Sequence, residues 1–379
     1  MSKRILVIGG YGNFGQFISR RLAREADVQI LIAGRNLAQA QALATTLNTT
    51  LPAPNPVLAV QLDIRSNLDA VLQQQQPFAV IHTSGPFQSQ GYDVAEACIR
   101  RGCQYIDLAD AREFVHGIHA LDQAAKAGGV LVCSGASSVP TLTSAIIDHY
   151  LHEFSRLLSA DYAISTAQKT SRGLATTAAV LSYAGKPFTT LNDGEMKPIH
   201  GWLDLRLRNF FGLGKRLLGN CDVPDLDLFP QRYPSLISVR FQAGLELKGV
   251  HAVLFGLSWL VRLGLLRSLQ PLAPTLLKIS RLLDPLGSDE SGFYMELRGL
   301  DHNSQPKQIR FDLLARRGDG MYIPCVPSIL MALKLARGEI MATGAQPSMG
   351  FISLEEYLEL LGEFAVEWRT VPARDMTVQ

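Results

Sequence analysis

The chain has 379 residues, of which 47% are hydrophobic and 18% are charged, with a formal net charge of +2. This length predicts two domains with ample buried core, and the small net charge, without any run of Lys or Arg, argues against a nucleic-acid partner. The five cysteines are scattered and have no C-x-x-C spacing, which argues against a disulfide framework or a metal site and favours a reducing cytoplasm.

The first predicted element is a buried strand over residues 5–8, followed by a cluster of glycines and by helical spacing over residues 14–22. Gly10, Gly12 and Gly15 form a G-x-G-x-x-G pattern at this strand-to-helix junction. In that context the glycines allow backbone N–H groups to approach the pyrophosphate of a dinucleotide. A tight turn that binds nothing is the alternative. The candidate cofactor-binding residues of this loop are Gly10, Gly12, Asn13, Phe14 and Gly15.

The end of the second predicted strand, over residues 28–36, distinguishes between the two nicotinamide dinucleotides. NAD enzymes usually place an acidic residue here, where it binds the ribose hydroxyls. This chain has Gly34 and Arg35 instead, and a guanidinium group would bind the 2′-phosphate of NADP. We therefore expect NADP, with Arg35 and Asn36 as contacts, although Arg35 could also be a solvated residue after a strand.

Strands and helices continue to alternate to residue 135, which predicts a doubly wound parallel sheet of the Rossmann type. Strands are expected over residues 57–63, 103–110 and 129–135, a strand that ends in a Gly-Pro turn over 78–87, and helices over residues 37–47, 93–102 and 111–128. Ligands of such sheets bind at the carboxyl ends of the strands. The candidates there are Asp63 and Ile64 on the adenine side, Ser84, Gly85 and Pro86 beside the nicotinamide, and Asp107 and Asp110. A simple turn role would explain Asp63 equally well.

The pattern changes after about residue 140. Helices are expected over residues 142–154 and 174–184, and strands that alternate apolar and polar residues over 197–207, 236–247, 293–301 and 308–318. Such alternation predicts a mostly antiparallel sheet with one open face. Helical patterns return over residues 326–339 and 353–365. We expect a Rossmann domain over residues 1–138, an inserted α+β domain for substrate and dimerisation over 139–320, and C-terminal helices over 321–379 that return to the first domain.

One apolar segment, residues 250–266, raises the question of a membrane. Arg262 interrupts it, and its apolar core is shorter than the roughly 20 residues that span a bilayer. Phe255, Trp259 and Leu263 share one face of the predicted helix. Packing in a core or a dimer is the favoured interpretation, and weak contact with a lipid surface is the alternative.

Four motifs together resemble the saccharopine dehydrogenase family, in its saccharopine dehydrogenase-like branch. They are GGYGNFG at residues 9–15, SGPF at 84–87, AC-x₄-GCQYIDLAD at 97–110 and GA-x-P-x-x-G-F-x-SLEEY at 344–357. The resemblance implies an NADP-binding Rossmann domain, an inserted substrate domain, and reduction of an imine or oxidation of a secondary amine. The chain departs from the family at residues 110–112 and in its apolar segment, which argues against saccharopine as its substrate.

Hydride transfer requires a group that manages one proton, and a carboxylated substrate also requires cations. Asp107 and Asp110 are the candidates for the first role, and Lys169 and Arg172 for either role, with structural roles as the alternative for each. The chain has no Y-x-x-x-K, G-x-S-x-G or H-E-x-x-H motif. We therefore expect a homodimeric, cytoplasmic, NADP-dependent oxidoreductase that acts at a C–N or carbonyl centre of a small substrate. The alternatives are an NADPH-binding sensor without turnover and a lipid-surface protein.

Overall fold

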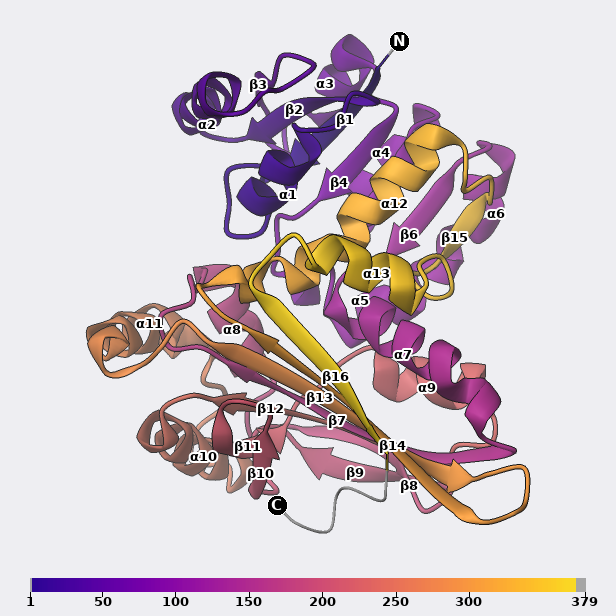
Figure 1. Ribbon diagram of the computed structural model, residues 1–379. Helices are drawn as coiled ribbons and strands as arrows, with labels where there is room; N and C mark the ends of the chain where they lie inside the picture. The colour runs from indigo at the N-terminus through magenta and orange to yellow at the C-terminus, as the bar shows by residue number, and fades with distance from the viewer. Residues whose placement is uncertain (1, 373–379) are drawn as a thin grey trace. The chain divides into compact units, whose positions relative to one another are not determined.

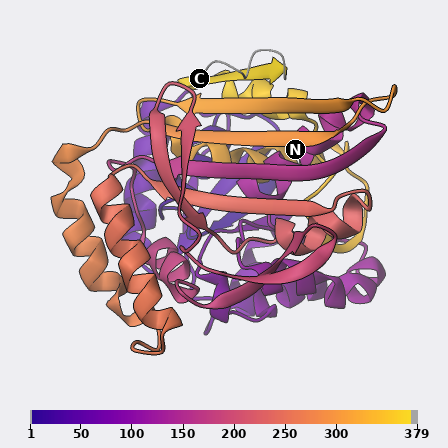
Figure 2. The same cartoon turned by 90° about the horizontal axis from the view of Figure 1, so that it is seen from below.

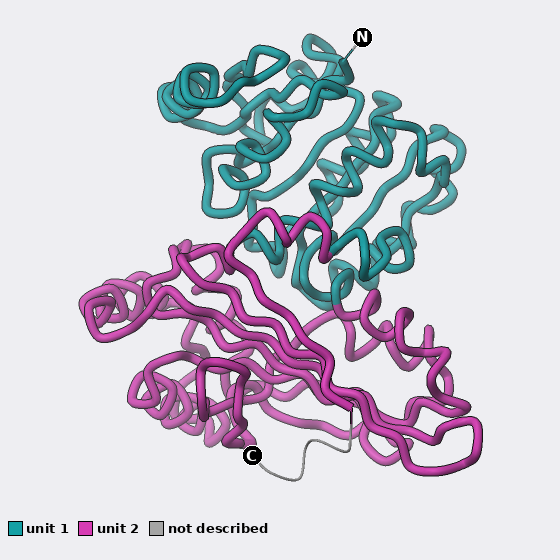
Figure 3. Tube along the Cα trace, viewed as in Figure 1, with its two compact units in different colours: residues 1–142, 321–357 teal, residues 143–320, 358–379 magenta. Residues whose placement is uncertain are grey.

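The computed structural model describes residues 2–372, and the chain divides into two compact units. Unit 1 comprises Met1–Leu142 and Met321–Tyr357, and unit 2 comprises Thr143–Gly320 and Leu358–Gln379 (Figure 3). Each unit contains its own seven-stranded sheet. The chain passes from one unit to the other three times, after Leu142, Gly320 and Tyr357.

The sheet of unit 1 is wholly parallel, in the order β15-β6-β5-β4-β1-β2-β3. The chain proceeds outward from β1 through β2 and β3, then returns to place β4 on the other side of β1. This reversal creates the position between β1 and β4 where doubly wound sheets bind ligands, and it confirms the predicted fold class. The strands are β1 Lys3–Ile8, β2 Val28–Gly34, β3 Leu58–Gln61, β4 Ala79–His82, β5 Gln104–Asp107, β6 Leu131–Ser134 and β15 Gly344–Pro347.

Helices cover both faces of this sheet, which explains why β1 and β2 are nearly continuous apolar runs. On one face, α3, α4 and α6 pack against a core that includes Leu6, Leu31 and Val80. On the other face, α1 and α12 lie side by side (Figure 1), where the rings of Phe17 and Tyr322 meet edge to face. The helices are α1 Gly15–Leu22, α2 Leu37–Thr50, α3 Leu68–Gln75, α4 Asp93–Arg100, α5 Arg112–Gly117, α6 Asp122–Ala127, α12 Val326–Arg337 and α13 Leu354–Leu361.

Two features of unit 1 differ from the sequence-based expectation. The helix expected over residues 111–128 is divided into α5 and α6 by a 3₁₀ turn at Ile118–Leu121, which follows the poor helix former Gly117. The sheet also has a seventh strand, because β15 pairs with β6 in the register Ala345 to Val132. This four-residue strand has no apolar alternation of its own, so its pattern could not have predicted it.

The sheet of unit 2 has the order β10-β11-β12-β7-β13-β14-β16. Only β12 and β7 run parallel among its described pairs, so the sheet is mixed and mostly antiparallel, as predicted. The strands are β7 Arg156–Thr166, β10 Arg206–Phe210, β11 Gly214–Asn220, β12 Ser238–Leu245, β13 Ser291–Leu300, β14 Pro306–Ala315 and β16 Val366–Pro372, with a separate hairpin of β8 Pro187–Asn192 and β9 Glu195–His200.

The helices of unit 2 lie around the ends of this sheet (Figure 2). They are α7 Thr143–Tyr150, α8 Leu174–Ser182, α9 Asp225–Arg232, α10 Lys248–Arg262 and α11 Ala273–Leu282. Helices α10 and α11 lie at the same end of the unit in both views. No helix among residues 2–372 is long and apolar enough to cross a membrane.

The central strands of unit 2 present one apolar face and one polar face, because successive side chains of a strand point in opposite directions. On β13, Phe293, Met295 and Leu297 are buried on the apolar face. Glu296 and Arg298 lie on the polar face, where Glu296 is paired across the sheet with Arg310 of β14. The hairpin of β10 and β11 extends over this polar face and is held there by the ring of Phe210, which packs edge-on against Tyr294.

Two segments of unit 2 also differ from the expectation. The strand expected over residues 197–207 is interrupted, since Trp202 and Asp204 have left-handed backbone conformations between β9 and β10. The C-terminal segment is not wholly helical: after α13, β16 pairs with β14 in the register Thr370 to Phe311. Its sequence VEWRTVP alternates in the manner of a strand at the edge of a sheet.

Candidate functional site

The glycine loop after β1 is packed so closely that side chains have no room at its key positions. A Cβ atom on Gly15 would lie 2.2 Å from the carbonyl oxygen of Gly9, and one on Gly12 would lie 2.9 Å from the same oxygen. Gly9 itself has a φ of +75°, which disfavours any other residue. The loop therefore brings the start of α1 against the end of β1, as the G-x-G-x-x-G pattern predicts.

This close packing leaves backbone donors without partners at the start of α1. Within the described chain, the N–H groups of Asn13, Phe14 and Gly15 make no hydrogen bond, and no side chain caps the helix. The side-chain oxygen of Asn13 is buried and also has no partner. Open N–H groups and the positive end of the helix dipole favour a bound phosphate. These residues fit the pyrophosphate of a dinucleotide.

The end of β2 is shaped by an aromatic side chain that the sequence analysis did not identify. A Cβ atom on Gly34 would lie 2.4 Å from the ring of Tyr11, and the hydroxyl of Tyr11 accepts a hydrogen bond of 2.9 Å from the N–H of Asn36. Asn36 in turn caps α2 by accepting from Gln39. An isolated glycine within a strand pattern often marks a place where another group approaches the backbone closely. Gly34 was the sequence signal that could have predicted the approach of Tyr11.

Arg35 lies exposed at this strand end, and its guanidinium group has no hydrogen-bond or ion-pair partner among the described residues. A free guanidinium beside the ribose end of the site is the arrangement that a 2′-phosphate requires. Asp63 and Ile64 follow β3 and have evident local roles. Asp63 accepts a hydrogen bond from the N–H of Arg65, and Ile64 packs against the core. Their contact with the adenine remains a prediction.

The loop after β4 lies directly beside the glycine loop. The hydroxyl of Thr83 donates to the carbonyl oxygens of Ile8 and Gly9, at 2.9 and 3.2 Å. A Cβ atom on Gly9 would lie 2.7 Å from the hydroxyl oxygen of Ser84. The structure therefore brings the predicted group Ser84, Gly85 and Pro86 to the predicted pyrophosphate loop. Thr83 is the side chain that joins the two loops.

Asp107 ends β5 and is fully buried. One of its carboxylate oxygens accepts three hydrogen bonds, from the N–H groups of Ala109 and Gly135 at 2.9 and 2.8 Å and from the hydroxyl of Ser134 at 3.0 Å. The other oxygen is buried and has no hydrogen-bond partner. Burial raises the pKa of Asp107 to about 6, against the effect of these three donors. Asp107 thus fixes the ends of β5 and β6 relative to each other.

Asp110, three residues farther along, is exposed, and one oxygen of its carboxylate accepts a hydrogen bond of 3.2 Å from Gln88. It follows β5 in the same unit as the glycine loop. Behind these loops, His82 contacts the hydroxyl of Tyr105 at 3.1 Å, and burial lowers the pKa of His82 to about 4. His82 is therefore neutral near pH 7 and belongs to the core.

The two predicted cations lie in unit 2. Lys169 is exposed, and its ammonium group has no ion-pair partner among the described residues. Arg172 is partly buried and donates to Asp284 and to the carbonyl oxygen of Gln168. Arg172 therefore anchors its loop to the segment after α11, whereas Lys169 is free to bind a ligand. The predicted carboxylates and cations belong to different units of the chain.

The raised pKa of Asp107 predicts a pH-dependent stability. The unfolded chain releases this proton from about pH 4, where Asp has its ordinary pKa of 3.8, whereas the folded protein holds it until about pH 6. The free energy of unfolding therefore falls by about 3 kcal/mol across this interval through Asp107 alone. Asp107→Asn cannot ionise, so its free energy of unfolding lacks this fall. The difference in the free energy of unfolding between Asp107→Asn and the wild type is therefore expected to shift by about this amount in favour of the variant as the pH rises from 4 to 7. Urea unfolding at several pH values measures the difference, and a constant difference would contradict this account.

Comparison with known proteins agrees with this geometry. Residues 5–133 match the family model of the saccharopine dehydrogenase NADP-binding domain. The whole fold is similar to that of apo saccharopine dehydrogenase (L-Glu forming) from Saccharomyces cerevisiae, with a TM-score of 0.69 and 14% identity over 98% of this chain and 100% of that chain.

Two mycobacterial relatives show a more limited similarity. A Mycobacterium tuberculosis protein with the provisional name of trans-acting enoyl reductase is 30% identical over 141 residues, or 36% of this chain and 33% of that protein. The trans-acting enoyl reductase of Mycobacterium leprae is 27% identical over 145 residues and is covered to the same extent. The chain thus matches about a third of the length of these relatives. Residues 5–133 are similar to a saccharopine dehydrogenase NADP-binding domain, in a chain whose fold is similar to that of a saccharopine dehydrogenase.

Proposed function

We propose that the protein is an NADP-dependent oxidoreductase that transfers a hydride at a C=N or C=O centre of a small substrate. The observation that carries this proposal is the start of α1, where glycine packing leaves the N–H groups of Asn13, Phe14 and Gly15 open beside the exposed Arg35 strand end. The matched NADP-binding domain supports the choice of cofactor. When bound, NADPH supplies the hydride.

Different residues of unit 1 would bind different parts of this cofactor. The glycine loop would bind the pyrophosphate, Arg35 the 2′-phosphate, and the loop of Ser84, Gly85 and Pro86 the nicotinamide half, because that loop lies against Gly9. Asp107 is a positioning residue, since its carboxylate is buried and its hydrogen bonds hold the strand ends. Asp110 and Lys169 are exposed and therefore remain the candidates for proton transfer.

The mycobacterial relatives add a further class of hydride acceptor. Their names describe enoyl reductases, which reduce a C=C bond conjugated to a carbonyl group. The same cofactor geometry would serve this reaction, because the hydride is again delivered to an electrophilic carbon.

An alternative to an enzyme is a sensor that binds NADPH without turnover. The homodimer and the reducing compartment remain predictions, and the five cysteines are all buried and outside disulfides, as a reducing compartment permits.

Contact with a lipid surface is a second candidate function, favoured by exposed apolar side chains at the ends of α10 and α11 and in the turn after α11. Leu263, Leu282 and Leu286 are 64, 79 and 72% exposed, and Trp259 stacks with the guanidinium of Arg262 at 4.8 Å. Residues 248–286 contain five Lys or Arg residues and a single acidic residue, which is paired with Arg172. A basic, amphipathic pair of helices is suited to the interface of an anionic bilayer.

We predict that Arg35→Ala weakens NADPH binding by at least about 1.5 kcal/mol more than NADH binding, the scale of one charged hydrogen bond. The physical reason is that only NADPH carries the 2′-phosphate. Calorimetric titration with both cofactors measures the effect. Arg4→Ala, which removes an exposed arginine from the opposite end of β1, is the matched control and should change neither affinity. Equal losses for both cofactors would exclude Arg35 from phosphate recognition.

The proposed activity is tested by mixing the purified protein with NADPH and candidate acceptors, and by following the absorbance of the reduced nicotinamide. The acceptors are cyclic imines, ketones and 2-enoyl thioesters. We expect oxidation with one class, and we expect Gly12→Val to abolish both cofactor binding and turnover, since its side chain would crowd the carbonyl of Gly9. Tight NADPH binding without oxidation by any class would identify a sensor. Failure of the wild type to bind NADPH would refute the proposal.

For the lipid surface, we predict that the wild type sediments with vesicles of phosphatidylserine and phosphatidylcholine and less with phosphatidylcholine alone. The double variant Leu263→Asp, Leu282→Asp should reduce the partition coefficient at least about tenfold, because each apolar side chain contributes about 1.5–3 kcal/mol on burial. Met341→Asp changes an 87% exposed side chain in unit 1 and serves as the control. Equal sedimentation of all three proteins would exclude α10 and α11 as the contact.

A further inference from the structure

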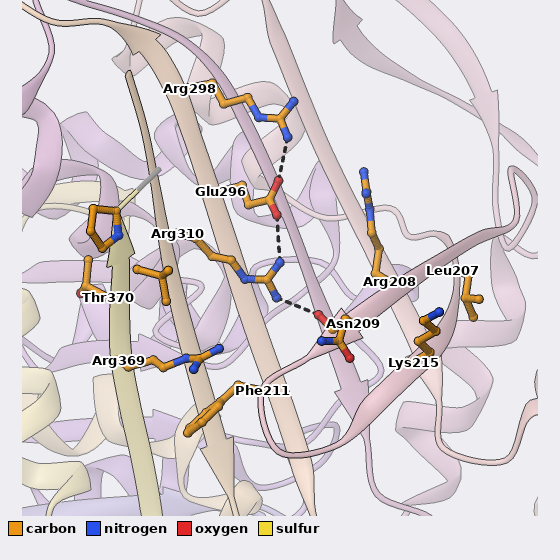
Figure 4. A pocket seen from close by; sticks show the side chains of 12 residues that line it. Leu207, Arg208, Asn209, Phe211, Lys215, Glu296, Arg298, Arg310, Arg369 and Thr370 are labelled. Carbon is orange, nitrogen blue, oxygen red and sulfur yellow. Dashed lines mark hydrogen bonds and ion pairs between the residues drawn. The ribbon is translucent and has the colours of Figure 1, made fainter. Parts of the chain in front are cut away.

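Unit 2 contains a pocket of about 690 Å³ on the polar face of its sheet. One wall is formed by β13, β14 and β16, and the other by the hairpin of β10 and β11 (Figure 4). All of its lining residues belong to unit 2. Its charged lining consists of five cations and one carboxylate: Arg208, Lys215, Arg298, Arg310, Arg369 and Glu296. The lining therefore has an excess of positive charge, part of which is balanced by ion pairs with Glu296 and with the buried Asp312.

Arg369 is held in a fixed orientation at one side of the pocket. Its Nε atom donates at 3.1 Å to Asp312, a carboxylate with 0% exposure, and its guanidinium carbon Cζ lies over the Phe211 ring, 4.1 Å from the ring centre. The two terminal nitrogens of Arg369 have no hydrogen-bond partner among the described residues. Because its orientation is already fixed, this guanidinium can bind a two-oxygen anion with little further loss of entropy.

Arg310 shows the contrasting arrangement. Its three nitrogens donate to Asp312, Glu296 and the carbonyl oxygen of Asn209, each at 2.8 Å. Each nitrogen of Arg310 thus has an acceptor, and this side chain holds the hairpin over the sheet. Asp312 binds both arginines through different oxygens, so it orients Arg369 while Arg310 fixes the pocket wall.

The opposite wall supplies further positive charge. Lys215 on β11 is exposed and has no ion-pair partner in the described part of the chain. Arg208 makes a long ion pair with Asp161, with 3.8 Å between the nearest nitrogen and oxygen atoms. Figure 4 shows these two side chains on the hairpin, across from Arg369 on β16. A ligand between the two walls would meet cations on both sides. Such a site favours a small molecule with two or more negative charges.

We propose that this pocket binds a small polyanion with phosphoryl or carboxylate groups, one of which forms paired hydrogen bonds with Arg369. The residues of this site belong to unit 2 and those of the glycine loop to unit 1, so the proposal goes beyond the oxidoreductase function and does not depend on it. Phe211 supports the binding group by stacking on its guanidinium, and Lys215 and Arg208 neutralise the remaining charge of the ligand.

The test is a calorimetric titration with pyrophosphate and, separately, with citrate. It uses the full chain carrying Gly12→Val, so that pyrophosphate cannot occupy the cofactor loop, and it is repeated with wild-type protein saturated with NADP. We expect Arg369→Gln to weaken binding of the preferred probe at least about tenfold, the equivalent of one charged hydrogen bond. A preference for pyrophosphate would identify a phosphorylated ligand, and a preference for citrate a carboxylated one.

Three further variants separate recognition from damage to the fold. Arg267→Gln removes an exposed arginine of unit 2 that does not line the pocket and should change the affinity less than twofold. Arg369→Lys keeps the charge but not the paired donors and should lose most of the affinity. Phe211→Leu leaves the ion pair of Asp312 intact and should weaken binding about threefold or more. The proposal is overturned if neither probe binds, or if Arg369→Gln and Arg267→Gln have equal effects.

Discussion

The close approach of α1 to the end of β1 is the constraint on which the cofactor site depends. At Gly15 the backbone comes so near the carbonyl oxygen of Gly9 that a Cβ atom would stand 2.2 Å from it. The N-cap residue of this helix is Phe14, which offers no side-chain acceptor, and the N–H groups of Asn13, Phe14 and Gly15 have no hydrogen-bond partner among the described residues. The tight packing thus places open N–H groups beside the strand end, an arrangement that suits a bound anion.

The other loops of unit 1 are arranged around that packing. The hydroxyl of Thr83 joins the end of β4 to the glycine loop, and the buried carboxylate of Asp107 joins the ends of β5 and β6. Burial disfavours the ionised form of Asp107, and the donors around it only partly offset that cost. The buried carboxylate of Asp107 therefore costs free energy when it is ionised. It also fixes the carboxyl edge of the sheet, where the substrate chemistry is proposed to take place.

Unit 2 uses charge in a different way. A single buried carboxylate, Asp312 of β14, orients two arginines: Arg310 from its own strand and Arg369 from the neighbouring β16. The two terminal nitrogens of Arg369 have no hydrogen-bond partner among the described residues. Ion pairs of this kind contribute little net stability, because the cost of desolvation offsets the Coulomb attraction. Such ion pairs fix the orientation of the arginine side chain. A guanidinium whose orientation is already fixed loses little conformational entropy when it binds an anion.

The sequence by itself determined the features that depend on near neighbours. The glycine loop, the parallel sheet of unit 1, the mostly antiparallel sheet of unit 2 and the choice of NADP as cofactor could be predicted, because each has a signal in a few adjacent residues or in a repeated period. The family resemblance, carried by the glycine loop and the SGPF loop, was confirmed by the matched domain.

Only the tertiary structure decided the features that join distant segments. The strand β15 lacks a pattern of its own, and Tyr11 reaches the end of β2 at Gly34, more than twenty residues away. Arg369 meets Asp312 across 57 positions of the chain because β16 pairs with β14. A periodic pattern indicates which face of an element is buried, but not which partner covers it. That choice is made when the whole core packs, because the free energy of burial depends on every surface that meets there.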